Sequence, residues 1–299
     1  MTINYSSLSS KPQHLNNLKI FLDSGDIDKT REIVSQIGFL DGQTTNPSLF
    51  AKSLISSNPN LTTNKFTEKE LWQNYETAIK EISKLYSEKK SISIEVYMNH
   101  DTTVAEILEQ AKKLVQWIPQ AWIKFPSNST GIESAKQFLE LSSSHRVNMT
   151  LGFTEEQLAS LYNATANIGE NRVFYSVFVG RLIDNGINAI EQIKNMKQLL
   201  TKETTNNHIQ LLGCSYRSLS QLVTSINAGV DIVTVPASIL LEWMKLDFSL
   251  ETSLETNELI APQCKNLSLE TPYTDYRLDF PLIKNGIDKF CADWDSLLI

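Results

Sequence analysis

One lysine stands inside an apolar run, where a charged side chain is unexpected. Lys124 is the only charged residue of the segment 121–126, Ala-Trp-Ile-Lys-Phe-Pro. Burial away from water disfavours the charged form of an amine. A neutral amine can attack a carbonyl carbon and form a Schiff base. Lys124 is therefore a candidate nucleophile, although a lysine at a strand end could equally reach solvent or pair with Glu95.

Polar residues also close the other apolar runs of the chain. They are Asp23, Thr44, Thr45, Asn46, Glu95, Thr150 and Ser176, with Arg181 following the sixth run and Ser215 and Arg217 following the seventh. If these runs are the strands of a parallel barrel, the reacting groups lie together at the carboxyl ends of the strands. The set therefore predicts one site in which Lys124 is surrounded by carboxylates, hydroxyls and amides.

The two carboxylates also have structural interpretations. Glu95 could serve only as the ion-pair partner of Lys124. Asp23 could cap the helix that begins near Asp26. Taken one at a time, these residues do not establish a site, and only their joint placement at successive strand ends indicates chemistry.

The uncharged candidates and the arginines have similar alternatives. Asn46-Pro47-Ser48 could be a turn, since Asn-Pro favours turn initiation. Thr150 and Ser176 could be core hydroxyls bonded to the backbone. Arg217 could be a residue at a helix start that faces solvent. A guanidinium group nevertheless matches phosphate oxygens with two parallel hydrogen bonds, which a lysine cannot form, so Arg181 and Arg217 are candidate phosphate ligands.

The elements that must position these residues follow an alternating pattern. Short runs rich in Ile, Val, Leu and Phe alternate with segments of helical period, which indicates a parallel sheet with crossover helices. We expect strands at residues 18–23, 38–44, 92–97, 121–126, 146–151, 172–178, 209–214 and 231–235. Eight alternations without a dinucleotide-binding fingerprint favour a closed barrel over an open sheet. The expected fold class is α/β, a (β/α)8 TIM barrel with an additional C-terminal helical segment.

Capping signals mark the beginnings of several helices. Thr67 with Glu70, and Thr154 with Gln157, have the spacing of a capping box. Asp101 is the expected cap of the helix that follows the third strand. These signals predict where three of the crossover helices start.

The chain is expected to form one catalytic domain over residues 1–299. Residues 1–17 are a polar N-terminal segment, and residues 246–299 are an extension that packs on the barrel and ends in a helix from about 282 to 298. The Ser/Asn/Thr-rich segment 53–64 also departs from the alternation. No composition break or internal repeat suggests a second domain.

Composition narrows the classes of function. The 299 residues carry a formal charge of -7, which argues against nucleic acid or an anionic membrane surface as main partner. No apolar run is long enough to span a bilayer, and a cytoplasmic location is expected. The three cysteines and four histidines lack the spacing of disulfides or metal ligands, so we expect no metal and reduced thiols.

Several segments taken in order resemble the successive motifs of transaldolase. The similarity runs from about residue 18 to residue 241, and residues 290–293 also resemble the terminal helix of the family. The segments are Leu22-Asp23-Ser24-Gly25-Asp26, Asp41-Gly42-Gln43-Thr44-Thr45-Asn46-Pro47-Ser48, Ile94-Glu95-Val96, Ile123-Lys124-Phe125-Pro126, Asn148-Met149-Thr150-Leu151, Ser176-Val177-Phe178-Val179-Gly180-Arg181 and Asp231-Ile232-Val233-Thr234-Val235-Pro236.

The resemblance implies transfer of a dihydroxyacetone unit in the pentose phosphate pathway. The donor would be sedoheptulose 7-phosphate and the acceptor glyceraldehyde 3-phosphate, giving erythrose 4-phosphate and fructose 6-phosphate without any cofactor. By resemblance, Lys124 forms the Schiff base, Asp23 takes the proton of the C4 hydroxyl, and Glu95 and Thr150 hold a water for proton transfer. The implied substrate-binding residues are Thr45, Asn46, Asn148, Ser176, Phe178, Arg181 and Arg217.

One residue bears on a closely related reaction. Phe178 stands where relatives of the aldolase type usually have tyrosine, so the resemblance favours group transfer over simple aldol cleavage. The alternatives are a fructose 6-phosphate aldolase and a catalytically silent barrel that binds sugar phosphates. Sugar phosphates are the expected partners in all three cases, and a homodimer is compatible with the sequence.

Overall fold

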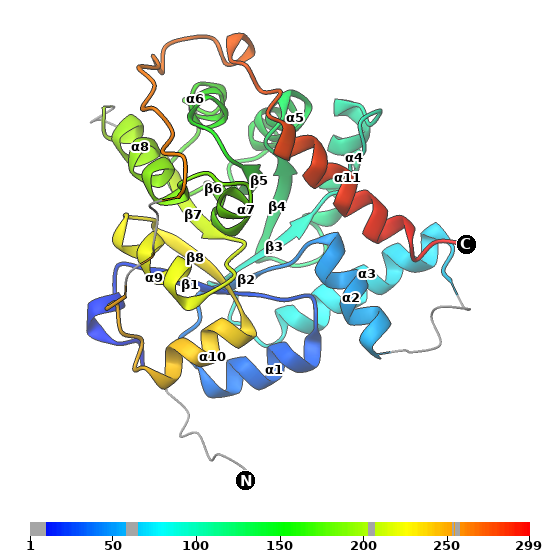
Figure 1. Cartoon of the computed structure of the whole chain (residues 1–299). Coiled ribbons are helices and arrows are strands. Elements are labelled where there is room, and N and C mark those ends of the chain that lie inside the picture. Colours follow the sequence, from blue (N-terminus) through cyan, green and yellow to red (C-terminus); the bar gives the residue numbers. More distant parts are fainter. Residues whose placement is uncertain (1–9, 58–64, 203–206, 253, 255–257) are drawn as a thin grey trace.

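Eight parallel strands close into a barrel in the computed structural model (Figure 1). The structure describes residues 10–57, 65–202, 207–252, 254 and 258–299. The strands pair in chain order, and β1 pairs with β8 to close the ring. The strands are β1 Lys19–Asp23, β2 Gly42–Thr44, β3 Ser91–Glu95, β4 Ala121–Pro126, β5 Val147–Gly152, β6 Val173–Phe178, β7 Ile209–Cys214 and β8 Ile232–Pro236. The expected α/β TIM barrel is confirmed.

Helices surround the barrel and cover its outer face (Figure 1). Residues 1–9 of the polar N-terminal segment and residues 58–64 of the Ser/Asn/Thr-rich segment lie outside the described residues. The α-helices are α1 Ile27–Gln36, α2 Pro47–Ser57, α3 Glu68–Ser83, α4 Val104–Leu114, α5 Ser129–Glu140, α6 Glu155–Ala164, α7 Val179–Asp184, α8 Ala189–Thr201, α9 Leu219–Asn227, α10 Ala237–Lys245 and α11 Pro281–Asp295, and the 3-10 turns are η1 Gln13–Leu15 and η3 Tyr273–Asp275.

Each of the eight expected runs forms a strand, with one large difference in length. β2 begins at Gly42 and not at residue 38. Phe39 and Leu40 are buried in the core ahead of the ladder, and Phe39 packs edge-on against Phe248 at 5.4 Å. The apolar run therefore begins before the paired residues, because tertiary packing, and not pairing in the sheet, buries its first part.

The capping signals are confirmed at two of the three expected helix starts. Thr67 and Thr154 form capping boxes at α3 and α6. Asp101 was the wrong cap for α4, which begins after Thr103, because Thr103 and Glu106 satisfy both halves of a capping box there. The cap of α1 is Asp26, which accepts a hydrogen bond from the Lys29 amide at 2.9 Å.

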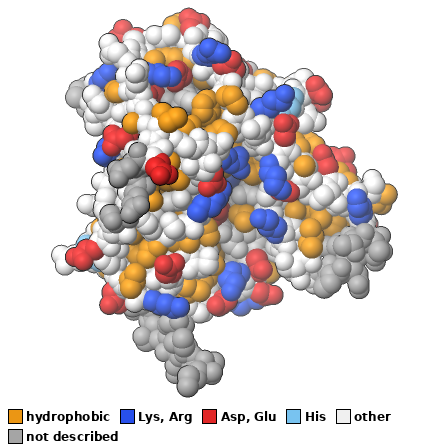
Figure 2. Space-filling view, in the orientation of Figure 1, with side chains coloured by type: hydrophobic (Ala, Val, Ile, Leu, Met, Phe, Trp, Pro, Cys, Tyr) orange, Lys and Arg blue, Asp and Glu red, His pale blue; other side chains and the backbone are white. Residues whose placement is uncertain are grey.

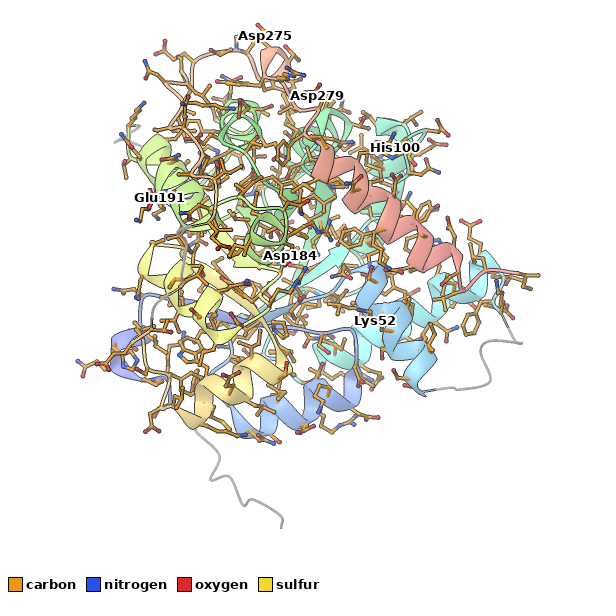
Figure 3. All side chains as sticks on the ribbon, in the orientation of Figure 1. Lys52, His100, Asp184, Glu191, Asp275 and Asp279 are labelled. Carbon is orange, nitrogen blue, oxygen red and sulfur yellow. The ribbon has the colours of Figure 1, made fainter. Side chains whose placement is uncertain are left out.

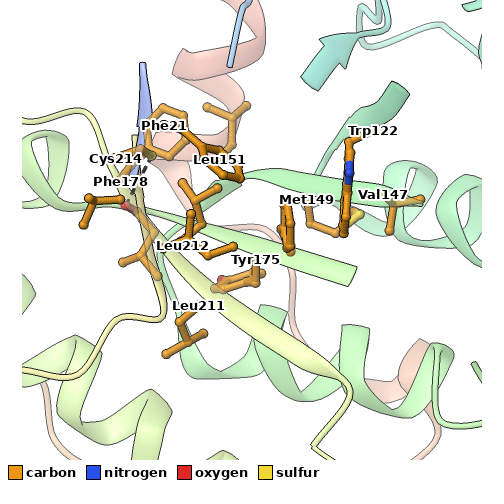
Figure 4. Close-up of a cluster of buried hydrophobic side chains, with 14 of the residues drawn as sticks. Phe21, Trp122, Val147, Met149, Leu151, Tyr175, Phe178, Leu211, Leu212 and Cys214 are labelled. Carbon is orange, nitrogen blue, oxygen red and sulfur yellow. Dashed lines mark hydrogen bonds between the residues drawn. The ribbon is translucent and has the colours of Figure 1, made fainter. Parts of the chain in front are cut away.

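Aromatic rings fill the barrel interior. Phe21 of β1 and Phe174 of β6 lie 5.9 Å apart, and Trp122 of β4 stacks on Phe174 at 3.6 Å. These strands are not neighbours in the sheet, so the rings meet inside the barrel. Figure 4 shows Trp122 among other buried hydrophobic side chains, including Met149 of β5 and Tyr175 of β6. Dense packing of this kind holds strand ends rigidly.

The C-terminal helix α11 lies across the side of the barrel that carries α7 (Figure 1). It packs against α2 and β5. Its end is tied down because the Phe66 amide donates to Leu297 O at 2.9 Å and the Ile299 amide donates to Phe66 O at 3.0 Å. The segment before it runs outside the barrel, where the Tyr273 amide donates to Asn163 Oδ1 at 3.0 Å.

Candidate active site

Lys124 lies at the floor of the site, paired with Glu95. The register of β3 and β4 places these two residues side by side. The Lys124 Nζ atom is 2.7 Å from Glu95 Oε2 and donates to Thr45 O at 2.8 Å. Lys124 is 5% exposed and Glu95 2%. The ion pair foreseen as a structural alternative is thus present, and it joins the amine to a base.

Burial and the Lys124 charge act on the Glu95 carboxyl in opposite directions. Burial raises the pKa of the Glu95 carboxyl, and the Lys124 charge opposes the rise. A buried carboxylate is a stronger base than an exposed one, because desolvation disfavours its charged form. Glu95 is therefore a base held 2.7 Å from the Lys124 amine.

Asp23 is the second carboxylate of the floor. It is placed at the end of β1, where its Oδ1 accepts from the Thr44 hydroxyl at 2.8 Å. Burial raises the pKa of Asp23, while the Lys124 charge and the Thr44 hydrogen bond lower it. Asp23 does not cap α1, since Asp26 does so. Its side chain remains at the cavity as an acid or base.

A chain of hydrogen bonds positions the hydroxyl of Ser176. Its Oγ donates to Asn148 Oδ1 at 2.6 Å, and Asn148 Nδ2 donates to Ser93 Oγ at 3.0 Å. Asn148 is fully buried and acts on the site through Ser176. The nearby Thr150 Oγ1 is buried and has no hydrogen-bond partner among the described residues. Since buried hydroxyls are normally bonded, Thr150 is suited to a bound water or substrate.

Thr45 and Asn46 contribute different groups to the site: Thr45 its backbone carbonyl, and Asn46 its side-chain amide. Asn46 Oδ1 accepts from the Leu49 amide at 2.8 Å, so the residue caps α2, whose first residue is Pro47. Its Nδ2 group is the part left to donate to a ligand. The Thr45 hydroxyl instead lies 3.0 Å from the Tyr75 hydroxyl. Side chains alternate along a strand, so Thr45 offers its carbonyl to Lys124 and turns its side chain away.

Two arginines stand at the rim of the site. The Arg181 guanidinium lies over the rings of Phe178 and Phe290, at 5.0 and 5.9 Å, and burial lowers the pKa of Arg181. Arg217 donates through Nε and NH2 to Asp184 Oδ2, at 3.1 and 3.0 Å. Both arginines are positioned to meet an anion that enters the cavity.

A cavity of about 350 Å³ connects the floor and the rim. Of the expected residues, Glu95, Thr45 and Asn148 stand behind its wall and the others line it. Lys and Arg side chains gather in the middle of the face shown in Figure 2, over the region where α7 and α11 lie in Figure 1. The lining residues are Asp23, Thr44, Asn46, Ser48, Leu49, Lys52, Lys124, Thr150, Ser176, Phe178, Arg181, Cys214, Ser215, Arg217, Thr234, Lys289, Phe290 and Asp293.

The sequence did not assign the residues that α11 brings to this cavity. Lys289, Phe290 and Asp293 line it, and Asp293 accepts hydrogen bonds from both Ser48 and Lys289. One signal was available in Gly286, in the middle of the helix. A Cβ there would lie 2.4 Å from Leu151 Cδ2 and 2.7 Å from an Arg181 guanidinium nitrogen. Glycine therefore lets α11 approach the rim closely.

Metal-ligand clusters and membrane-spanning helices are both absent from the part of the chain that the structure describes. No group of three or more His, Cys, Asp or Glu side chains there could hold a metal ion. No described helix is both long and apolar enough to cross a membrane. The three cysteines, Cys214, Cys264 and Cys291, are free thiols.

Comparison with known proteins places the chain in a family. Residues 20–299 match the family described as Transaldolase/Fructose-6-phosphate aldolase. A protein of Brucella ovis named "Probable transaldolase" is 29% identical, over 79% of this chain and 95% of that protein. Proteins of the same name from Lactiplantibacillus plantarum (27% identical, 74% and 87% covered) and Dehalococcoides mccartyi (26% identical, 94% and 99% covered) are also similar. The family match spans nearly the whole chain, which therefore belongs to the transaldolase/fructose-6-phosphate aldolase family.

Proposed function

We propose that the protein is a transaldolase that moves a dihydroxyacetone unit from sedoheptulose 7-phosphate to glyceraldehyde 3-phosphate through a Schiff base on Lys124. The observation that carries the proposal is the convergence of Lys124, Asp23 and two arginines on one cavity of about 350 Å³. A ketose phosphate substrate requires an amine to form the Schiff base, a base to take the hydroxyl proton and guanidinium groups to bind the phosphate. The products are erythrose 4-phosphate and fructose 6-phosphate.

The first half of the reaction uses the floor of the cavity. Glu95 takes a proton from Lys124, and the neutral Nζ attacks C2 of the ketose. The carbonyl oxygen leaves as water, which Thr150 is suited to bind because its Oγ1 has no hydrogen-bond partner among the described residues. The product is an iminium ion, whose positive nitrogen can accept an electron pair.

The second half breaks and remakes a carbon–carbon bond. Asp23 takes the proton of the C4 hydroxyl, the C3–C4 bond breaks, and its electron pair moves to the iminium nitrogen, giving an enamine and a free aldose. The enamine then attacks the aldehyde carbon of the acceptor, and Asp23 returns its proton to the new hydroxyl. Water releases the product from Lys124. General acid–base help of this kind contributes ~10²–10⁴ in rate.

The arginines at the rim account for the choice of phosphorylated sugars. Arg181 follows the end of β6 and Arg217 the end of β7, so a chain that begins at Lys124 can extend its distal phosphate towards both. Charge-assisted hydrogen bonds to phosphate are about twice as strong as neutral ones. Asn46 and Ser176 remain to hold the hydroxyls of the three-carbon unit.

A fructose 6-phosphate aldolase is the second candidate, because the family to which the chain belongs includes both activities. The two reactions share the steps up to the enamine and differ in its fate. A transaldolase holds the enamine until an aldehyde arrives, whereas an aldolase protonates it and releases dihydroxyacetone. Phe178 supports transfer, because phenylalanine cannot hold a water by a hydrogen bond as tyrosine can.

One assay separates these functions. The protein is incubated with fructose 6-phosphate with and without erythrose 4-phosphate, and glyceraldehyde 3-phosphate and free dihydroxyacetone are measured. Sustained turnover only with erythrose 4-phosphate supports the transaldolase. Release of dihydroxyacetone without acceptor, at a rate comparable to transfer, supports the aldolase. Binding of fructose 6-phosphate without turnover in either mixture contradicts both and indicates a silent barrel.

A further inference from the structure

The two arginines at the rim differ in how the protein itself holds them. The Arg181 guanidinium lies over aromatic rings. Arg217 donates three hydrogen bonds, two to Asp184 Oδ2 and one from NH1 to Ser215 O at 3.0 Å. Three of the five N–H groups of Arg217 are thus engaged. An anion that reaches Arg217 meets a guanidinium whose charge is already shared with a carboxylate.

Stability gives little reason for a carboxylate at position 184. Asp184 is the last residue of α7, and a negative charge at a helix C-terminus is unfavourable. The side chains of Arg217 and Asp184 are 49% and 46% exposed, and exposed ion pairs contribute little. Figure 3 shows Asp184 near the middle of the face that carries the cavity. Its position is better explained by its effect on Arg217.

The fold couples α7 rigidly to the segment that carries Arg217. A Cβ at Gly180 would lie 2.0 Å from Ser215 O and 3.1 Å from Arg217 Cγ. Ser215 itself has a φ of 66°, in the left-handed region that few residues other than glycine adopt. The start of α7 therefore packs directly on residues 215–217. The same short helix supplies Arg181 and the carboxylate that restrains the other arginine.

We propose that Asp184 is a positioning residue that orients Arg217 and weakens its hold on the substrate phosphate, so that the phosphorylated product can leave. This inference rests on the proposed function, since a sugar phosphate must be the ligand. A unit charge ~5 Å from an anion at an exposed rim changes the affinity by about three- to tenfold. Asp184 thus sets the balance between binding of the substrate phosphate and release of the phosphorylated product.

Phosphate binding to the full chain tests this directly. Inorganic phosphate and fructose 6-phosphate are titrated by calorimetry into the unsubstituted protein and into Asp184→Asn, which keeps an oxygen acceptor for Arg217 and removes the charge. We expect about three- to tenfold tighter binding of both ligands. In steady state, KM for fructose 6-phosphate falls by a similar factor and kcat falls, because product leaves more slowly. The KM for unphosphorylated fructose does not change.

A matched control is Asp279→Asn. Asp279 pairs with Arg277 at 2.7 Å on the surface, with side chains 66% and 84% exposed, and Figure 3 shows it well away from Asp184. The substitution Asp279→Asn removes the same charge from an exposed Arg–Asp pair. Its effect on the cavity should be small, because charges are screened beyond ~10 Å. Its phosphate affinity should equal that of the unsubstituted protein.

The outcomes separate this proposal from the function on which it rests. Unchanged or weaker phosphate binding in Asp184→Asn overturns the role of Asp184, as does an equal gain in Asp279→Asn. The gain should also disappear when Arg217→Met is added, and a gain that persists contradicts an action through Arg217. If the unsubstituted protein binds neither phosphate nor fructose 6-phosphate, the proposed function fails together with this inference.

Discussion

The floor and the rim of the cavity hold their charges in opposite ways. At the floor, Lys124 and Glu95 are at most 5% exposed and 2.7 Å apart, so each charge depends on its partner. At the rim, Arg217 and Asp184 are almost half exposed, and water screens them. The same ion-pair chemistry thus serves reactivity when it is buried and affinity when it is exposed. Substitutions at the floor should therefore act mainly on kcat, and those at the rim should act mainly on KM.

The largest effect after loss of Lys124 is expected at Asp23. Asp23→Asn keeps an oxygen that can accept from the Thr44 hydroxyl but removes the base. We expect kcat to fall by ~10²–10⁴, with a much smaller change in KM, measured by steady-state transfer from fructose 6-phosphate to erythrose 4-phosphate. Thr102→Val, on the exterior loop before α4, is a control. A decrease of less than tenfold in kcat contradicts the assignment of Asp23 as the base.

At the rim, Arg181→Lys should raise KM without a comparable loss of kcat. A lysine keeps the charge but cannot form two parallel hydrogen bonds to a phosphate. The loss of a charge-assisted bond corresponds to an increase of about ten- to a hundredfold in KM for fructose 6-phosphate. Unphosphorylated fructose should be affected far less, and Arg277→Lys at the exposed surface should have no effect. Equal increases in KM for both sugars would contradict the assignment of Arg181 to the phosphate site.

Gly286→Ala tests the close approach of α11 to the rim. The added Cβ meets Leu151 at 2.4 Å and the Arg181 guanidinium at 2.7 Å, so one of them must move. Overpacking costs ~1–3 kcal/mol, which exceeds the gain of up to ~1 kcal/mol in helix propensity. We expect a lower free energy of unfolding in urea and a higher KM for fructose 6-phosphate. Gly169→Ala, where a Cβ has no neighbour within 4 Å, is the control, and equal stability of the two variants would contradict the tight contact.

The smallest expected effect is the pH-dependent change in stability caused by Asp23→Asn. Burial raises its pKa in the folded state, so the stabilisation linked to its protonation is present below the unfolded pKa, ~3.9, and is lost as pH rises through the folded pKa. Asp23→Asn removes this dependence. Its Tm should exceed that of the unsubstituted protein at neutral pH, by about 2–4 °C for each kcal/mol, and the difference should vanish in acid. A difference that grows as pH falls has the wrong sign and contradicts the buried carboxyl.

The floor and the two arginines of the rim could be predicted from the sequence, and the tertiary contacts around those arginines could not. Lys124, Glu95 and Asp23 are strand-end residues in near-continuous apolar runs, and the barrel rule places strand ends together. The orientation of Thr45 follows from alternation along the chain, since the side chain of the preceding Thr44 faces Asp23. The start of β2 could not be predicted, because packing in the core buries Phe39 and Leu40 ahead of the paired residues. The placement of Asn148 behind Ser176 depends on strand register.

Gly286 indicates that α11 packs closely against another element, but no local signal in the sequence says which one. Lys289, Phe290 and Asp293 reach the cavity because a helix distant in sequence crosses the barrel end and packs on α2 and β5. Helical periodicity predicts that such a helix exists but not where it lies. In the same way, the pair of Asp184 and Arg217 joins the end of α7 to the segment after β7, across 33 residues of sequence. Tertiary contacts of this kind cannot be predicted from local patterns in the sequence.

Reductive trapping tests the central claim most directly. The protein is incubated with fructose 6-phosphate, reduced with borohydride, digested, and mapped by mass spectrometry, with Lys124→Ala and Lys52→Ala as matched variants of two lysines that line the same cavity. A reduced three-carbon adduct on Lys124, retained in Lys52→Ala and absent in Lys124→Ala, is the predicted result. No adduct in the unsubstituted protein, or an adduct on another lysine, would contradict the Schiff-base mechanism at the floor of the barrel.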